Sequence, residues 1–130
     1  MGSDYLIDTN TILYLLDKQL SATAEAFLSD IVDDVCQLSV ISQIELLSWQ
    51  TTDVQARTTM ETFVAGCTVI ELSTAVVRRT IQLRQAHKMK LPDAVIAATA
   101  LINGWILISR NDNDFRKIGE LKYINPFTDL

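Results

Sequence analysis

Acidic side chains follow or begin the apolar stretches of this sequence at four places. They are Asp8, Glu45, Asp93 and the neighbouring pair Asp112 and Asp114. Carboxylates brought to one place repel one another, and such a cluster persists mainly where a hard divalent cation neutralises it. Ligation by oxygen alone indicates Mg²⁺ or Mn²⁺, and zinc is not expected because no Cys or His accompanies these acids.

The apolar stretches themselves alternate between extended and helical patterns. Short strands are predicted at 5–7, 37–40, 68–70, 105–108 and 122–125, and helices at 9–16, 21–32, 42–49, 53–65, 73–87 and 92–102. All-apolar strands separated by helices are typical of a parallel sheet covered on both faces, which makes the fold class α/β. Ligands of such sheets bind beyond the carboxyl ends of the strands, where these acids are expected.

The helix that begins near Pro92 has the clearest pattern in the chain. Pro92 suits the first turn, and Asp93 follows in the same turn, where exposed backbone N–H groups favour a carboxylate. Residues 94–102 are apolar nearly all round, and Asn103-Gly104 ends the helix. A helix of this kind is expected at the centre of the molecule, with Asp93 at its entrance.

Each acid also has a structural interpretation. Asp8 can serve only as a helix cap, and Glu45 can be an ordinary solvated helix residue. Asp93 can do no more than complement its helix dipole. Asp112 and Asp114 flank Asn113 in a predicted polar turn, and one of the two acids is expected to be only a turn residue.

The net charge of −5 and pI near 4.7 argue at first against a nucleic-acid partner. The charge is unevenly distributed, however. Residues 1–77 hold 2 basic and 11 acidic residues, a net charge of −9, whereas residues 78–130 hold 9 basic and 5 acidic residues, a net charge of +4. A basic sector beside an acidic metal site suits a phosphodiester substrate, although a solvated basic helix face would give the same count.

Length and composition favour one soluble domain. With 130 residues and 48% hydrophobic residues, a single domain spanning 1–130 is expected. Cys36 and Cys67 lie among apolar neighbours at a spacing that indicates no zinc or redox site, so two buried free thiols and a cytoplasmic setting are expected. No signal peptide or membrane span is predicted. His87 has no nucleophile pattern near it, and no glycine-rich phosphate loop is present.

Five segments, in this order, resemble the motifs of one family. They are Leu6-Ile7-Asp8-Thr9-Asn10, Val40-Ile41-Ser42-Gln43-Ile44-Glu45-Leu46, Leu91-Pro92-Asp93-Ala94-Val95-Ile96-Ala97-Ala98-Thr99-Ala100, Ser109-Arg110-Asn111-Asp112-Asn113-Asp114-Phe115 and Asn125-Pro126-Phe127. Together they resemble the PIN-domain ribonucleases, and within them the VapC-type toxins of bacterial toxin–antitoxin pairs.

The resemblance implies a PIN-like, Rossmann-like three-layer α/β/α fold with a short central parallel sheet. It assigns metal ligation and catalysis to Asp8, Glu45, Asp93 and Asp114. Ser109 stands where the family usually has Thr. Asp112 is an acid that the motif does not require, and it remains an alternative fourth ligand. The resemblance also implies homodimers and an antitoxin whose C-terminal segment wraps the toxin and blocks its site.

The function predicted on this basis is Mg²⁺- or Mn²⁺-dependent endoribonuclease activity, in the toxin of a toxin–antitoxin pair. Asn10 and Ser109 are expected to orient ligands or water, and Arg110 to contact the RNA backbone. The alternatives are a solitary PIN-domain nuclease without an antitoxin, a non-catalytic PIN-like binding module, and a receiver-like signalling domain that binds Mg²⁺. A receiver domain needs an acidic pair after its first strand, and Asp8 has no acidic neighbour.

Overall fold

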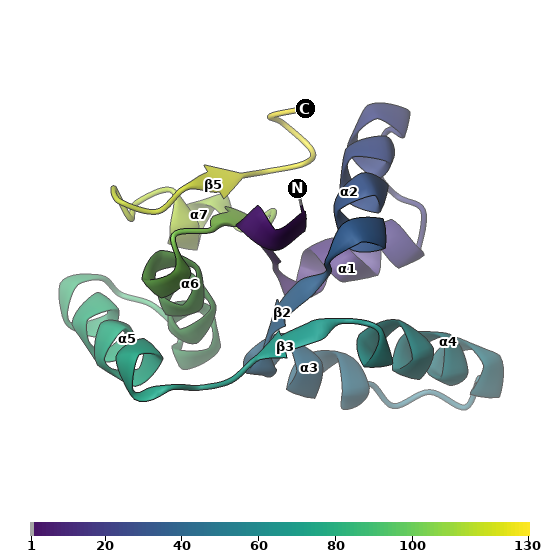
Figure 1. Cartoon of the computed structure of the whole chain (residues 1–130), viewed down its shortest axis with the longest axis horizontal. Helices are drawn as coiled ribbons and strands as arrows, with labels where there is room; N and C mark the ends of the chain where they lie inside the picture. The colour runs from purple at the N-terminus through teal and green to yellow at the C-terminus, as the bar shows by residue number, and fades with distance from the viewer. Residues whose placement is uncertain (1) are drawn as a thin grey trace.

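Short parallel strands form the centre of the molecule (Figure 1). The computed structural model describes residues 2–130. Its strands are β1 (Tyr5–Ile7), β2 (Gln37–Ser39), β3 (Thr68–Ile70), β4 (Ile106–Ile108) and β5 (Tyr123–Ile124). The pairings are all parallel and give one sheet of order β1-β4-β5 and another of β2 and β3. The Gln37 side chain joins the two sheets, because its Nε2 donates to the carbonyl of Tyr5 at 2.8 Å.

Helices connect these strands. They are η1 (Gly2–Asp4), α1 (Thr9–Leu16), α2 (Ala22–Asp34), α3 (Val40–Leu47), α4 (Val54–Ala65), α5 (Thr74–Ala86), α6 (Leu91–Asn103) and the short α7 (Asp112–Phe115). Within residues 2–130, no helix is both long enough and apolar enough to cross a lipid bilayer.

Two hydrophobic cores lie on opposite sides of the strands. Leu6 and Leu107 belong to the core that contains α5, α6 and α7, whereas Ile7 and Ile108 belong to the core that contains α1, α2 and α4. Neighbouring residues of a strand point to opposite faces of its sheet, so both faces are covered by helices, as Figure 1 also shows. The predicted three-layer α/β/α fold with a short parallel sheet is therefore confirmed.

Helix α6 is the central buried helix that the sequence predicts. Its residues 94–100 are all buried, and Pro92 lies in its first turn. Gly104 ends the helix with φ of 68°, a left-handed conformation that glycine adopts without steric cost. Asp93 lies in the first turn, half-buried, at the end of α6 that faces the other acids.

Some local predictions were wrong. Helix α3 is capped by Ser39 and not by Ser42, so it begins two residues earlier than the predicted 42. The polar turn predicted around Asn113 is a helix, α7. Cys67 is only half-buried, although both cysteines are free.

Candidate active site

Asp8 lies at the carboxyl end of β1, where it caps α1. Its amide N–H donates to the carbonyl of Ile108 at 3.0 Å, which extends the pairing of β1 with β4 and places Ser109, the residue after β4, beside Asp8. Ser109 Oγ donates to Asp8 Oδ2 at 2.7 Å, and the Thr9 N–H donates to Asp8 Oδ1 at 2.8 Å. Both carboxylate oxygens are thus held in a fixed direction, with 5% of the residue exposed.

Asp114 is connected to Asp8 through the loop that follows β4. The Asn111 N–H donates to Ser109 Oγ at 3.1 Å, and Asn111 Nδ2 donates to Asp114 Oδ2 at 2.7 Å. The only ion pair of Asp114 among the described residues is a weak one, with Lys117 Nζ at 3.9 Å. Ser109 and Asn111 therefore link the two carboxylates.

Glu45 reaches the same region from α3. Its Oε1 accepts a hydrogen bond from Thr9 Oγ1 at 2.7 Å, and the same hydroxyl lies 2.9 Å from Ser42 Oγ. Thr9 directly follows Asp8, so this contact places the exposed Glu45 next to the end of β1.

These carboxyl groups face one another, and among the described residues the weak pairing of Lys117 with Asp114 is their only ion pair. Burial raises the pKa of Asp8, with a smaller contribution from the charge of Glu45, and outweighs the hydrogen bonds from Ser109 and Thr9. Burial, followed by the charges of Asp8 and Asp114, raises the pKa of Asp93 to about 6. The Asp93 and Asp114 carboxyls lie within hydrogen-bonding reach of each other. The structure thus brings together all four acids that the resemblance assigned to metal ligation.

The donor set fits a hard divalent cation in its chemistry. It consists of carboxylate oxygens supported by hydroxyl and amide groups, and oxygen donors are those that Mg²⁺ and Mn²⁺ prefer. A cation would also relieve the mutual repulsion that raises the pKa of Asp93. Within residues 2–130, no three His, Cys, Asp or Glu side chains converge closely enough to form a complete metal site.

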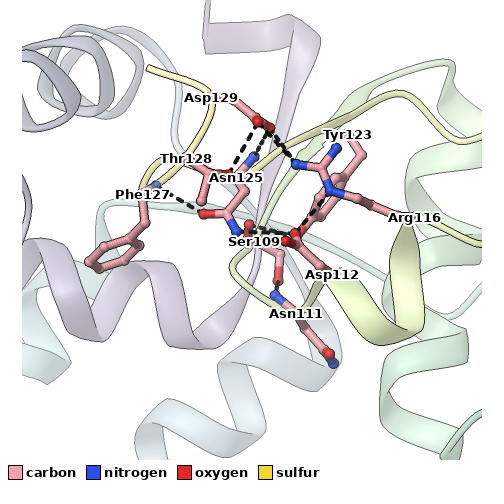
Figure 2. Close-up of polar contacts among 9 residues, drawn as sticks. All are labelled: Ser109, Asn111, Asp112, Arg116, Tyr123, Asn125, Phe127, Thr128 and Asp129. Atoms are coloured by element: carbon pink, nitrogen blue, oxygen red, sulfur yellow. Dashed lines mark hydrogen bonds and ion pairs between the residues drawn. The ribbon is translucent and has the colours of Figure 1, made fainter.

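Asp112 contacts Tyr123, Asn125 and Arg116 (Figure 2). Its Oδ1 accepts hydrogen bonds from Tyr123 Oη at 2.7 Å and Asn125 Nδ2 at 3.0 Å, and forms an ion pair with Arg116 Nε at 3.2 Å. The hydrogen bonds from Tyr123 and Asn125, with the Arg116 charge, hold the pKa of Asp112 below its ordinary value. Asp114, rather than Asp112, is therefore the acid of this loop that faces Asp8 and Asp93.

Ser109, Asn10 and Arg110, which the sequence predicts to orient ligands or contact RNA, have different surroundings in the structure. Ser109 is fully buried and bonded to Asp8. Asn10 Oδ1 accepts a hydrogen bond from Thr11 Oγ1 at 3.3 Å, and within the described chain no hydrogen bond joins Asn10 to the acids. Arg110 is exposed, and its guanidinium lies 4.0 Å from the ring centroid of Phe127 and 5.3 Å from that of Tyr14.

Much of the basic sector is paired within the molecule. Arg79 pairs with Glu120 at 2.5 Å and Arg116 with Asp129 at 2.8 Å, while Lys117 Nζ donates to the carbonyl of Lys88 at 2.8 Å. The charge count therefore overstates the basic surface available to a substrate near the acids.

Sequence reasoning missed the groups that hold the acids in place. Thr9, Ser42, Asn111 and Tyr123 were not predicted as site residues. The first three lie inside the motifs, within three residues of an acid, so their position was a usable signal. Tyr123 lies on β5, and only the fold brings it to this loop.

An apolar groove of about 700 Å³ begins beside Thr9 and Glu45. It runs between α1, α3 and α4, and its apolar lining includes Leu13, Tyr14, Trp49 and Met60. Leu13 is 45% and Trp49 48% exposed, so the groove presents apolar surface to solvent.

The fold and the acidic site together define a known class of protein. Residues 5–121 match the model of the PIN domain family, so the chain belongs to this family, as its motifs predict. PIN domains are nucleases as a class. This membership excludes the receiver-like alternative. No curated protein sequence matches the chain.

Solved toxin–antitoxin complexes share this fold. The chain is 25% identical to a chain of a toxin–antitoxin complex from Klebsiella pneumoniae, with a TM-score of 0.74, covering 95% of this chain and 98% of that one. It is 21% identical to a chain of VapBC2 from Rickettsia felis bound to a promoter DNA fragment, with a TM-score of 0.78, covering 93% and 97%. For FitAcB from Neisseria gonorrhoeae the identity is 17% and the TM-score 0.76, covering 95% and 99%.

Proposed function

We propose that this chain is a Mg²⁺- or Mn²⁺-dependent endoribonuclease and the toxin of a toxin–antitoxin pair. The observation that carries the proposal is the gathering of Asp8, Glu45, Asp93 and Asp114, in a member of the PIN domain family. Among the described residues, only Lys117, 3.9 Å from Asp114, pairs with any of these acids. A structural role alone would leave this repulsion uncompensated, whereas a metal-binding role accounts for it.

The chain's own residues would hold the ion and keep its ligands oriented. Asp8 is the best-fixed ligand because both of its oxygens accept hydrogen bonds, from Ser109 and Thr9. Thr9 also holds Glu45, and Asn111 holds Asp114. When bound, a divalent ion supplies Lewis acidity toward a phosphodiester and makes a coordinated water more acidic.

Arg110 is the side chain best placed to contact the RNA backbone. It directly follows Ser109, and the rings of Phe127 and Tyr14 hold its guanidinium while leaving the residue exposed. Among the described residues, the side chains of Lys88 and Lys90, just before α6, have no hydrogen bond or ion pair. These three cations can provide the phosphate contacts on which affinity for RNA depends.

The apolar groove supports an antitoxin as partner. It ends at Thr9 and Glu45, so a peptide segment lying in the groove would reach the acids and block access to them. The similarity of the fold to chains of VapBC complexes agrees with this arrangement. A homodimer of toxin chains is part of the same proposal.

The catalytic proposal is tested by incubating the purified chain with structured RNAs in EDTA, Mg²⁺ or Mn²⁺. We expect cleavage only with a divalent ion, and none by the Asp8→Ala and Asp93→Ala variants. The matched control is Asp30→Ala, because Asp30 is exposed on α2 and has no hydrogen bond or ion pair within residues 2–130. Equal cleavage by all four proteins would refute the proposal.

The toxin role is tested separately. Induction of the chain alone is expected to stop bacterial growth, and growth should return when the product of a small open reading frame directly upstream is co-expressed. A genome without such a reading frame would favour the solitary nuclease.

A further inference from the structure

The segment after β4, which comprises a short loop and the start of α7, sends its side chains to two sides. Ser109, Asn111 and Asp114 are bonded to one another or to Asp8, as described above. Asp112 instead faces β5 and the C-terminal segment, 125–129 (Figure 2). This carboxylate is the acid that the family motif does not require, so its role needs a separate explanation.

Tyr123 connects Asp112 to the candidate metal ligands. Its hydroxyl oxygen lies 2.7 Å from Asp112 Oδ1 and 2.9 Å from the carbonyl oxygen of Ser109, so one hydroxyl hydrogen serves two acceptors. The same Ser109 donates through Oγ to Asp8 at 2.7 Å. The position of Tyr123 therefore fixes the backbone of the residue that orients Asp8.

Asn125 forms a second connection on the same side. It is 3% exposed, donates through Nδ2 to Asp112, and accepts the Phe127 N–H at 2.9 Å through Oδ1. Phe127 in turn lies against the guanidinium of Arg110, the neighbour of Ser109. Asp112 thus holds the C-terminal turn against the loop that carries the site.

Arg116 contacts three members of this arrangement. Its Nε pairs with Asp112 at 3.2 Å, its Nη2 pairs with Asp129 at 2.8 Å, and its guanidinium lies 4.9 Å from the centre of the Tyr123 ring. Arg116 thus holds the Asp112 carboxylate in the position from which it accepts hydrogen bonds from both Tyr123 and Asn125.

We propose that Asp112 is a positioning residue of the metal site. Through Tyr123 and Asn125 it fixes the backbone from Ser109 to Asn111, which in turn orients the carboxylates of Asp8 and Asp114. This inference rests on the proposed function, because it assigns the purpose of the orientation to metal binding. Outer partners of metal ligands typically contribute about 10- to 100-fold in affinity or activity.

The first test measures Mn²⁺ affinity by titration calorimetry. Asp112→Ala and Tyr123→Phe are each expected to weaken binding by about 10-fold. Asp112→Asn keeps an oxygen acceptor and is expected to stay within about 3-fold of the wild type, since only the charge assistance is lost. The control is Glu120→Gln, which removes an exposed arginine–carboxylate pair of the same region and should change nothing.

A direct ligand would behave differently from a positioning residue. Loss of binding in both Asp112 variants, with normal binding by Tyr123→Phe, would make Asp112 a ligand and overturn the proposal. Normal affinity in Asp112→Ala would also overturn it. A wild-type chain that binds no Mn²⁺ would instead overturn the proposed function on which the inference rests.

Hydrogen exchange in the metal-free protein separates the two proposals. Amides of the segment 109–111 are expected to exchange several-fold faster in Asp112→Ala and Tyr123→Phe, and at the wild-type rate in Glu120→Gln. Unchanged exchange in Asp112→Ala would overturn the positioning role whatever the metal result. Measurement below the melting temperature of every variant keeps global unfolding out of the comparison.

Discussion

Two groups of carboxylates lie on either side of one short loop, and their surroundings shift their pKa values in opposite directions. Asp8 and Asp93 face other acids, and burial and repulsion raise their pKa. Asp112 and Asp129 face hydrogen-bond donors and Arg116, which lower their pKa. The acids of the first group thus raise the free energy of the folded state at neutral pH, whereas those of the second group lower it.

The direction of the pKa shift distinguishes acids expected to bind a ligand from acids expected to stabilise the fold. A carboxylate that only stabilises the fold is expected to be paired, because an unpaired and partly buried charge is costly. Carboxylates that gather in one place and raise one another's pKa are candidates for a binding site. By this criterion we expect Asp93 to belong to the proposed metal site and Asp112 to the scaffold around it.

The largest expected effect is the response of the acidic group to a divalent ion. At a Mn²⁺ concentration of 100 times Kd, the proposed site should raise the free energy of unfolding by about 2.7 kcal/mol, because the ion binds only the folded state. Asp8→Asn should abolish this increase. Thermal unfolding with and without Mn²⁺ measures it, and an equal increase in wild type and Asp8→Asn would place the ion elsewhere.

Replacement of Asp93 should stabilise the metal-free protein. The pKa of Asp93 is about 6, against an ordinary value of 3.8, so its ionised form is unfavourable in the folded state. After a discount for solvent screening, Asp93→Asn is expected to raise the free energy of unfolding at pH 7 by about 1–2 kcal/mol. Asp112→Asn should lower it, and urea denaturation of both variants in EDTA checks the opposite signs.

The opposite pKa shifts of the two groups predict that their contributions to folding stability change with pH in opposite directions. The raised pKa of Asp93 gives stability that is fully present below 3.8 and is lost as the pH rises through about 6. The lowered pKa values of Asp112 and Asp129 give stability that is present above 3.8 and is lost as the pH falls below it.

Urea denaturation in EDTA between pH 4.5 and 7.5 isolates the first contribution. The wild type should become less stable as the pH rises across this range, and Asp93→Asn should reduce the slope. If Asp93→Asn leaves the dependence of stability on pH unchanged, a group other than Asp93 takes up the proton.

The sequence predicts much of this arrangement, since the strands and helices that carry the acids have strong local patterns. Helix α6 is apolar nearly all round, and β1 and β4 are short apolar runs whose carboxyl ends meet at Asp8 and Ser109. Parallel pairing of these two strands places Asp8 beside Ser109, and α6, which precedes β4 in the chain, carries Asp93 in its first turn at the same end of the sheet.

What the sequence does not predict depends on local geometry and distant partners. Ser39 and Ser42 are both acceptable helix caps, and packing decides between them. Asp112 and Asp114 are two residues apart, so recognising α7 as a helix would have placed them on opposite sides of it. The pairing of Arg79 with Glu120 spans 41 residues and has no local signal.

The smallest expected effect on stability comes from the ion pairs that Arg116 forms with Asp112 and Asp129. Arg116→Gln removes the cation shared by Asp112 and Asp129, both of which keep hydrogen bonds from other donors. The melting temperature should therefore fall only slightly at low salt, and the difference from the wild type should shrink at 1 M NaCl, where the Debye length is about 3 Å. A loss of stability that salt leaves unchanged would mean that Arg116 acts through its packing on Tyr123, and the second group would then be held together by contact rather than by charge.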